Sequence, residues 1–248
     1  MTNVLTHVEQ LTPMMLTHLL RECGVLQKAE VTKISQIQSN QTNVSFVSHL
    51  AVHYTMKEHS APTKLFLKIP NPDFNWGDRE VRFYTEIVPI MLERYDWKTL
   101  PFLHCFDVAY SAKSGRSHFL FENVADSYFS VGGLMPTAPQ HYKLAIDAFA
   151  QFHAFWWEHP KLGQVFGEKQ TEESIAQFLT SAQAKFDDFT SFMGARMSKT
   201  QRMILQAVVS TWPTKRQKRL IQGQGITLVH RDPHPLNLLY SHDVRMLA

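Results

Sequence analysis

The stretch that decides the fold is Leu228-Val-His-Arg-Asp-Pro-His-Pro-Leu-Asn-Leu-Leu-Tyr240, near the end of the 248 residues. Apolar Leu228 and Val229 precede a polar segment with two prolines, and Leu-Leu-Tyr follows it. Apolar pairs on both sides of such a segment are typical of two short strands joined by a loop. The pattern therefore predicts a strand–loop–strand unit with Asp232 and Asn237 in the loop.

The composition indicates a folded protein. Apolar residues make up 44% of the chain and charged residues 19%, a balance that supplies a core and argues against disorder. The first ten residues lack an apolar signal core, and no apolar run approaches the ~18 residues of a membrane span. The two cysteines match no zinc or disulfide pattern, which suits a reducing compartment. We therefore expect a cytoplasmic protein without a membrane partner.

One dense basic run, Lys215-Arg-Gln-Lys-Arg219, follows Pro213. Such a run can form a nucleic-acid or phosphate patch. The simpler interpretation is a solvated loop after the proline, because the net charge of +3 is otherwise spread along the chain. We expect no nucleic-acid partner.

The periodicity of apolar residues changes along the chain. Short alternating runs predict strands over 31–37, 44–52, 64–69, 102–110 and 117–121. Spacings of three and four predict helices over 11–22, 77 to the low nineties, 139–158, 172–193 and 198–211. Pro89 is expected to kink or end the second of these helices. Strands first and helices second, with Gly132-Gly133 between them, predict an α+β protein with two lobes.

Asp232 and Asn237 have the separation found in H-R-D-x-x-x-x-N, the catalytic-loop motif of kinases. In that motif the aspartate accepts the proton of the substrate hydroxyl and the asparagine binds Mg²⁺. Asx residues also form ordinary turns. The spacing, together with His234 and the flanking apolar pairs, favours the functional interpretation.

Phosphoryl transfer also needs a cation near the nucleotide phosphates and a group that holds the cation in place. Lys68, in Leu65-Phe-Leu-Lys-Ile-Pro70, follows apolar residues on a predicted strand. Two glutamates lie on the next predicted helix. Glu80 belongs to its apolar side, whereas Glu86 lies on the polar side, where a pair with Arg82 is expected. Glu80 is therefore the better partner for Lys68.

His230-Arg-Asp-Pro-His-Pro-Leu-Asn237 resembles the aminoglycoside phosphotransferase and choline kinase superfamily, including its ecdysteroid kinase-like branch. His234 stands where protein kinases usually carry lysine, and Arg231 stands where this family usually has glycine. The resemblance covers roughly residues 31–247. It is supported by the order of four further segments, 65–70, 79–84, 119–124 and 152–156.

The resemblance implies a protein kinase-like fold, with a β-rich nucleotide-binding lobe over 1–124 and a helical catalytic lobe over 125–248. By position, Asp232 is the catalytic base, Asn237 a Mg²⁺ ligand, Lys68 a contact to the ATP phosphates, and Glu80 its partner. The hinge that reads the adenine edge comprises Glu122, Asn123 and Val124. The phosphate-covering loop is Gln38-Ser-Asn-Gln-Thr-Asn43, with Ser39, Asn40 and Thr42 as donors; it lacks the glycines of protein kinases.

In that family a second metal-binding Asp follows the catalytic loop after roughly a dozen residues, and from Asn237 eleven residues remain. Asp243 precedes the expected strand and is not assigned this role. We therefore expect an incomplete catalytic lobe with uncovered apolar surface through which the chain can self-associate.

The resemblance thus implies an ATP- and Mg²⁺-dependent phosphotransferase acting on a hydroxyl group of a small molecule. Aminoglycosides, choline-like amines and steroid-like alcohols are the acceptor classes of its relatives. The alternative is a catalytically inactive nucleotide-binding or interaction protein that lacks the second metal-binding Asp. Nucleotide binding without phosphoryl transfer would favour the inactive protein over the phosphotransferase.

Overall fold

The computed structural model describes residues 4–71, 73, 77–130, 139–164, 171–230 and 232–243. The chain forms two compact units, Met1–Ala148 with Asp232–Ala248, and Phe149–Arg231. The predicted lobe boundary after residue 124 stays a prediction. Gly132-Gly133, Arg231 and the strand expected from residue 244 lie outside the described residues.

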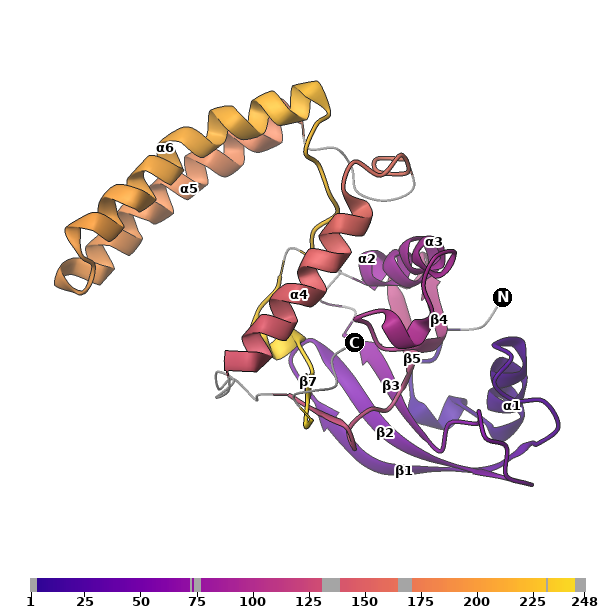
Figure 1. The fold of residues 1–248 in the computed structure, drawn as a ribbon. Helices are drawn as coiled ribbons and strands as arrows, with labels where there is room; N and C mark the ends of the chain where they lie inside the picture. The colour runs from indigo at the N-terminus through magenta and orange to yellow at the C-terminus, as the bar shows by residue number, and fades with distance from the viewer. Residues whose placement is uncertain are drawn as a thin grey trace. The chain divides into compact units, whose positions relative to one another are not determined.

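The first unit is built on a five-stranded antiparallel sheet with strand order β1-β2-β3-β5-β4 (Figure 1). Its strands are β1 (Val31–Gln41), β2 (Ser45–Tyr54), β3 (Lys64–Pro70), β4 (Cys105–Ser111) and β5 (Arg116–Glu122). All five strands predicted from these short runs are confirmed, and β4 and β5 are joined by a turn at residues 112–115. β1 is longer than predicted, because residues 38–41 pair with β2 and do not form a loop.

The two faces of this sheet carry different cores. Residues of β2 and β3 join helix α1 (Pro13–Glu22) in the larger cluster, which includes Leu16, Leu20, Leu65 and Leu67. Thr12 caps α1 by accepting a hydrogen bond from Met15 N at 3.2 Å. On the other face, Phe119 and Phe121 of β5 form a second cluster with Val81. Side-chain alternation along each strand separates these two clusters.

The helix after β3 is continuous but contains a π-turn. It comprises α2 (Gly77–Arg82), the π-helical segment η2 (Phe83–Ile87) and α3 (Val88–Leu92). Pro89 has no N–H, so the carbonyl of Thr85 cannot receive the usual bond from four residues later. The backbone widens, and Val88 N donates to Phe83 O, five residues back. Pro89 therefore disturbs the helix as predicted, but it widens one turn and does not end the helix.

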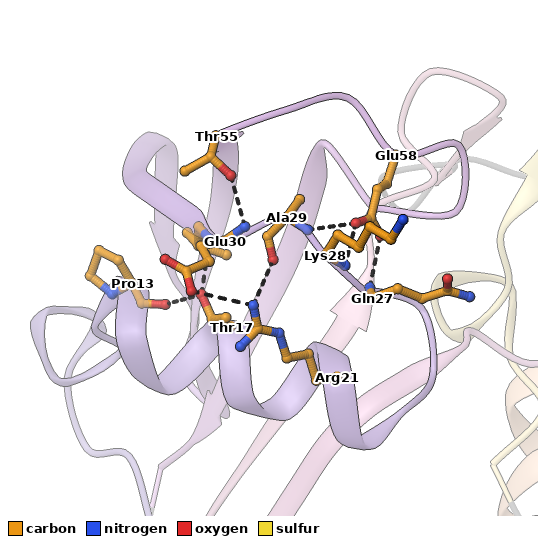
Figure 2. A network of polar contacts seen from close by, with 10 residues as sticks. Pro13, Thr17, Arg21, Gln27, Lys28, Ala29, Glu30, Thr55 and Glu58 are labelled. Atoms are coloured by element: carbon orange, nitrogen blue, oxygen red, sulfur yellow. Dashed lines mark hydrogen bonds and ion pairs between the residues drawn. The ribbon is translucent and has the colours of Figure 1, made fainter.

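A polar network joins α1, the start of β1 and the loop between β2 and β3 (Figure 2). Backbone N–H groups of Gln27, Lys28 and Ala29 all donate to the carboxylate of Glu58, at 2.8, 2.6 and 2.5 Å. Arg21 donates to the carbonyl of Ala29 at 3.2 Å. These hydrogen bonds, that from Gln27 first, lower the pKa of Glu58 below its ordinary value.

We expect Glu58→Gln to lower the melting temperature at pH 7, because a neutral amide accepts fewer and weaker bonds than the carboxylate. The folded-state pKa is depressed, so the stabilisation is complete above the unfolded-state value of 4.5 and is lost as pH falls through the folded-state value. The difference between the two proteins should therefore narrow as thermal melts are recorded from pH 7 down to pH 3. Glu9→Gln, at an exposed residue, is the control and should melt as the parent does. A difference in melting temperature between Glu58→Gln and the parent that does not depend on pH would contradict this account.

The remaining elements of the first unit are short. They are η1 (Val8–Gln10), η3 (Trp97–Thr99), η5 (Pro235–Asn237) and a two-stranded antiparallel sheet of β6 (Tyr128–Phe129) and β7 (Tyr240–Ser241). Phe129 pairs with Tyr240 in this sheet. The sheet joins the segment after β5 to the segment after Asn237, two parts of the chain more than a hundred residues apart.

The second unit is helical. Helix α4 (Pro139–Trp156) ends in it, and α5 (Glu172–Met193), η4 (Gly194–Arg196) and α6 (Lys199–Gln222) follow. α5 and α6 lie side by side as an antiparallel hairpin (Figure 1). In the described part of the chain, no helix is both long enough and apolar enough to cross a membrane.

The prediction that residues 215–219 form a loop after Pro213 is wrong, because α6 continues through the proline to Gln222. An internal proline costs about 3 kcal/mol, but Lys, Arg and Gln are favourable helix residues. The contact of Arg216 with Phe178 on α5 further stabilises the helix after the proline. The Arg216 guanidinium lies 4.7 Å from the Trp212 ring and 5.3 Å from the Phe178 ring.

Candidate active site

Lys68 lies on β3, where successive side chains point to opposite faces of the sheet. Leu67 and Ile69 are buried in the core beside α1, so Lys68 points to the other face. Its Nζ lies 5.5 Å from the centroid of the Phe119 ring on β5, and its side chain is 28% exposed. The sheet therefore covers the aliphatic stem and leaves the ammonium accessible.

Glu80 on α2 holds that ammonium. Lys68 Nζ donates to Glu80 Oε2 at 2.7 Å and to Oε1 at 2.8 Å. Glu86 instead accepts from Arg82 Nε at 2.9 Å, the expected pair within the helix. The predicted contact of Lys68 with Glu80, and not with Glu86, is confirmed. Phosphate binding by Lys68 stays a prediction.

Aromatic contacts seat the glutamate's helix on the sheet. The Tyr84 ring lies 5.2 Å from the Phe121 ring and 6.1 Å from the Phe119 ring, measured between centroids. Burial raises the pKa of Tyr84 well above its ordinary value. Because Tyr84 follows Glu80 by four residues, the two share a helix face. The packing of Tyr84 therefore helps to fix Glu80 against Lys68.

The predicted phosphate-covering segment is a hairpin. Ser39 and Asn40 lie on β1, opposite Ser48 and Val47 of β2. Thr42 lies in the turn that follows. The segment therefore comprises the end of β1 and the turn that leads into β2. The pairing of these two strands fixes the backbone on both sides of the turn.

Two residues shape the turn itself. Thr42 Oγ1 donates to Ser45 O and accepts from Ser45 N, both at 3.0 Å. Asn71, just after β3, donates from its backbone N to Val44 O at 2.9 Å and from Nδ2 to Asn43 O at 3.4 Å. The turn borders a polar hollow of about 590 Å³ lined by Gln41, Thr42, Asn43 and Asn71.

The predicted hinge residues directly follow or end β5. Asn123 ties the hinge to two strands: its Nδ2 lies 2.9 Å from His49 Nδ1 on β2 and donates to Leu65 O on β3 at 3.4 Å. Its Oδ1 accepts from Ala125 N at 3.0 Å. The carbonyl of Val124 accepts from Ser127 N and Tyr128 N, both at 2.9 Å, and so is already used. Within the described residues no hydrogen bond is formed by the Val124 N–H.

Asp232 and Asn237 lie at the two ends of a tight loop that contains η5. Asn237 Nδ2 donates to Asp232 Oδ2 and to Asp232 O, both at 3.0 Å. The predicted strand at Leu228-Val229 does not form, and the predicted strand after the loop begins only at Tyr240. β7 pairs there with β6, a partner that the sequence did not reveal.

His234 contacts the carboxylate of Asp232. Leu236 N donates to His234 Nδ1 at 3.2 Å, so the ring proton resides on Nε2. Nε2 lies 3.4 Å from Asp232 Oδ2. The loop thus places Nε2 of His234 beside the carboxylate of the candidate base. In the sequence His234 stands out only as a marker of the motif; its place two residues after Asp232 was the available signal.

The donor atoms in this loop fit a magnesium ion that is shared with a nucleotide. With Asn237 Nδ2 turned to Asp232, the amide oxygen Oδ1 is the atom left for a ligand, and Asp232 supplies carboxylate oxygen. Mg²⁺ prefers oxygen ligands and commonly binds one or two protein groups, substrate phosphates and waters. The described residues contain no cluster of three or more His, Cys, Asp or Glu that could hold a metal alone.

The structure therefore brings the predicted residues together in two pairs, Lys68 with Glu80 and Asp232 with Asn237. Both pairs belong to the first unit. Sequence reasoning missed the supporting residues Asn71 and His49. Asn71 lies between two prolines, a context that indicates a turn and not a binding residue, and a lone histidine on a strand carries no signal.

The chain matches the ecdysteroid kinase-like family over residues 39–246. No curated protein matches the chain. The matched range contains both pairs and the hinge, and the architecture, a β-sheet followed by helices, is α+β and protein kinase-like. The chain therefore belongs to the ecdysteroid kinase-like family.

Proposed function

We propose that this protein transfers the γ-phosphoryl group of ATP, with Mg²⁺, to a hydroxyl group of a small molecule. The observation that carries the proposal is the bidentate Lys68–Glu80 pair, with contacts of 2.7 and 2.8 Å, in the same unit as the Asp232–Asn237 loop. A strand lysine paired with a helix glutamate is the arrangement that kinases use to hold nucleotide phosphates. Family membership supports a kinase activity on small molecules.

In this proposal Lys68 donates to oxygens of the α- and β-phosphates, and Glu80 keeps its ammonium in position. Ser39, Asn40 and Thr42 lie on the hairpin that covers the phosphates, where backbone N–H groups can donate. Thr42 N and Thr42 Oγ1 both donate to Ser45 O, at 2.9 and 3.0 Å, so Thr42 serves the proposed site by holding the turn in shape. The open N–H of Val124 reads the adenine edge, with Glu122 and Asn123 as the rest of the hinge.

Asp232 accepts the proton of the acceptor hydroxyl as the oxygen attacks, and the carboxylate orients that hydroxyl. Asn237 Nδ2 donates to Asp232 Oδ2, and His234 Nε2 lies 3.4 Å from the same oxygen, so both side chains help to orient Asp232. Asn237 Oδ1 would hold Mg²⁺, which would neutralise charge on the phosphates when it is bound.

The acceptor belongs to the class of small alcohols, and aminoglycoside-, choline- and steroid-like compounds are the first to test. The two free cysteines fit a reducing compartment, so the cytoplasm is part of the proposal.

The test is transfer of radiolabelled γ-phosphate from ATP by the full-length gene product, with and without Mg²⁺, to a panel of alcohols and their deoxy analogues. We expect Mg²⁺-dependent labelling of an alcohol and none of its deoxy analogue. ATP binding without transfer to any acceptor would instead favour the catalytically inactive alternative. Absence of ATP binding by calorimetry would contradict the phosphotransferase and leave, of the alternative, only an interaction protein that does not bind nucleotide.

A further inference from the structure

The C-terminal half of α6 presents three cations on one helix face. Lys215, Lys218 and Arg219 follow the spacing of three and four residues that places side chains side by side. All three are exposed, and none forms an ion pair with a carboxylate among the residues that the structure describes. Arg216 points elsewhere, over the rings of Trp212 and Phe178. The helix therefore separates one basic face from the face that packs on α5.

This basic face forms one wall of a groove within the second unit. The groove encloses about 410 Å³ and is lined by Trp157, Glu158, Lys215, Lys218, Arg219, Gln222, Gln224 and Gly225. Small-molecule sites commonly enclose ~300–1,000 Å³. Trp157 is 53% exposed, so its apolar ring is available in the groove that the cations line. The remaining wall carries two amide side chains, which can donate hydrogen bonds.

The carboxylate of Glu158 is held at the groove wall by backbone contacts, and among the described residues it forms no ion pair with the lysines. Glu158 Oε1 accepts from Gly225 N at 2.6 Å, and Glu158 N donates to Ile226 O at 2.8 Å. Glu158 has a φ of +51°, in the left-handed region that disfavours residues other than glycine. Residues held in such conformations are concentrated at ligand sites, where surrounding contacts offset the strain. Here the contacts hold Glu158 at the groove wall beside Trp157.

The geometry points to a second anion site in this protein, a groove on α6 that binds the phosphate group of a small phosphorylated molecule. Lys215, Lys218 and Arg219 bind the phosphate oxygens, the glutamines donate to neighbouring polar atoms, and Trp157 packs on the body of the ligand. A concave groove on two turns of one helix suits a compact anion better than a nucleic-acid strand, which needs a longer basic track. The site is separate from Lys68 and does not depend on the proposed phosphotransferase activity.

The probe is inorganic pyrophosphate, titrated without Mg²⁺ at low ionic strength and followed by calorimetry and tryptophan fluorescence. We expect one saturable site, a fluorescence change that Trp157→Phe abolishes, and weaker binding as salt is raised. Lys215→Gln with Lys218→Gln should weaken the affinity about tenfold, because two solvent-exposed charge contacts are lost and each such contact is weaker than a buried one. Both lysines are exposed, so the thermal melt should not change.

Two variants distinguish this groove from a general attraction of anions and from the predicted nucleotide site. Lys185→Gln, at an exposed lysine on α5, should bind as the parent does. Lys68→Ala should also retain pyrophosphate binding, since it changes only the predicted nucleotide site. The proposal is overturned if no saturable binding occurs, if the double variant binds as tightly as the parent, or if Lys68→Ala alone removes binding. Tighter binding of a single-stranded RNA than of pyrophosphate would also overturn it, in favour of a nucleic-acid surface.

Discussion

Asp232→Asn in the full-length gene product is expected to reduce kcat for phosphoryl transfer by about 10²–10⁴-fold, the usual contribution of a positioned general base. The amide cannot accept the hydroxyl proton. It can keep a contact to Asn237 and to His234, which lie 3.0 and 3.4 Å from Asp232 Oδ2. ATP affinity should therefore change little, because the predicted phosphate contacts of Lys68 are untouched.

The measurement is kcat for the best acceptor, together with the ATP dissociation constant from calorimetry. Asp188→Asn, at an exposed aspartate on α5, is the matched control and should leave both unchanged. If Asp232→Asn retained more than about a tenth of kcat, a loss below ~1.4 kcal/mol, the catalytic-loop interpretation would have to be abandoned.

Local patterns were sufficient for most elements of the fold. The short apolar-rich run Leu65-Phe-Leu-Lys-Ile69 predicted strand β3, and in the structure the burial of Leu65, Leu67 and Ile69 on one face leaves Lys68 on the other. The same reasoning on the following helix separated Glu80 from Glu86, and the contacts agree. These predictions succeeded because each depends on the order of apolar and polar residues within one short segment, and that order also determines which side chains are buried.

Features that depend on distant partners were not predictable. The β6–β7 pair joins Tyr128-Phe129 to Tyr240-Ser241, and neither segment is long enough to be recognised alone. Pro213 was expected to end its helix, since its local cost is real, but the contact of Trp212 and Arg216 with Phe178 on α5 is visible only in three dimensions. The orientation of His234 likewise depends on a backbone N–H of the folded loop.

Lys68→Ala is expected to weaken ATP binding about 10–100-fold, the effect of losing charge-assisted hydrogen bonds worth ~1.5–3 kcal/mol. The change also leaves the carboxylate of Glu80 without its cation, which adds repulsion towards the phosphates. Glu80→Gln should have a smaller effect, because it loosens the lysine without removing it. Glu86→Gln should have almost none, since Glu86 binds Arg82 and not Lys68.

Lys64 provides a control on the same strand. It is a lysine of β3 whose Nζ pairs with Asp126 at 2.7 Å, but its partner follows the hinge and does not lie on α2. Lys64→Ala therefore removes one charge and one ion pair from the same sheet without touching Glu80. Calorimetry of all four variants with ATP and Mg²⁺, alongside thermal melts, separates binding from stability. Equal losses of ATP affinity in Lys64→Ala and Lys68→Ala would mean that the net charge of the sheet attracts the nucleotide. A selective loss in Lys68→Ala and a partial loss in Glu80→Gln would assign the phosphate contact to this pair.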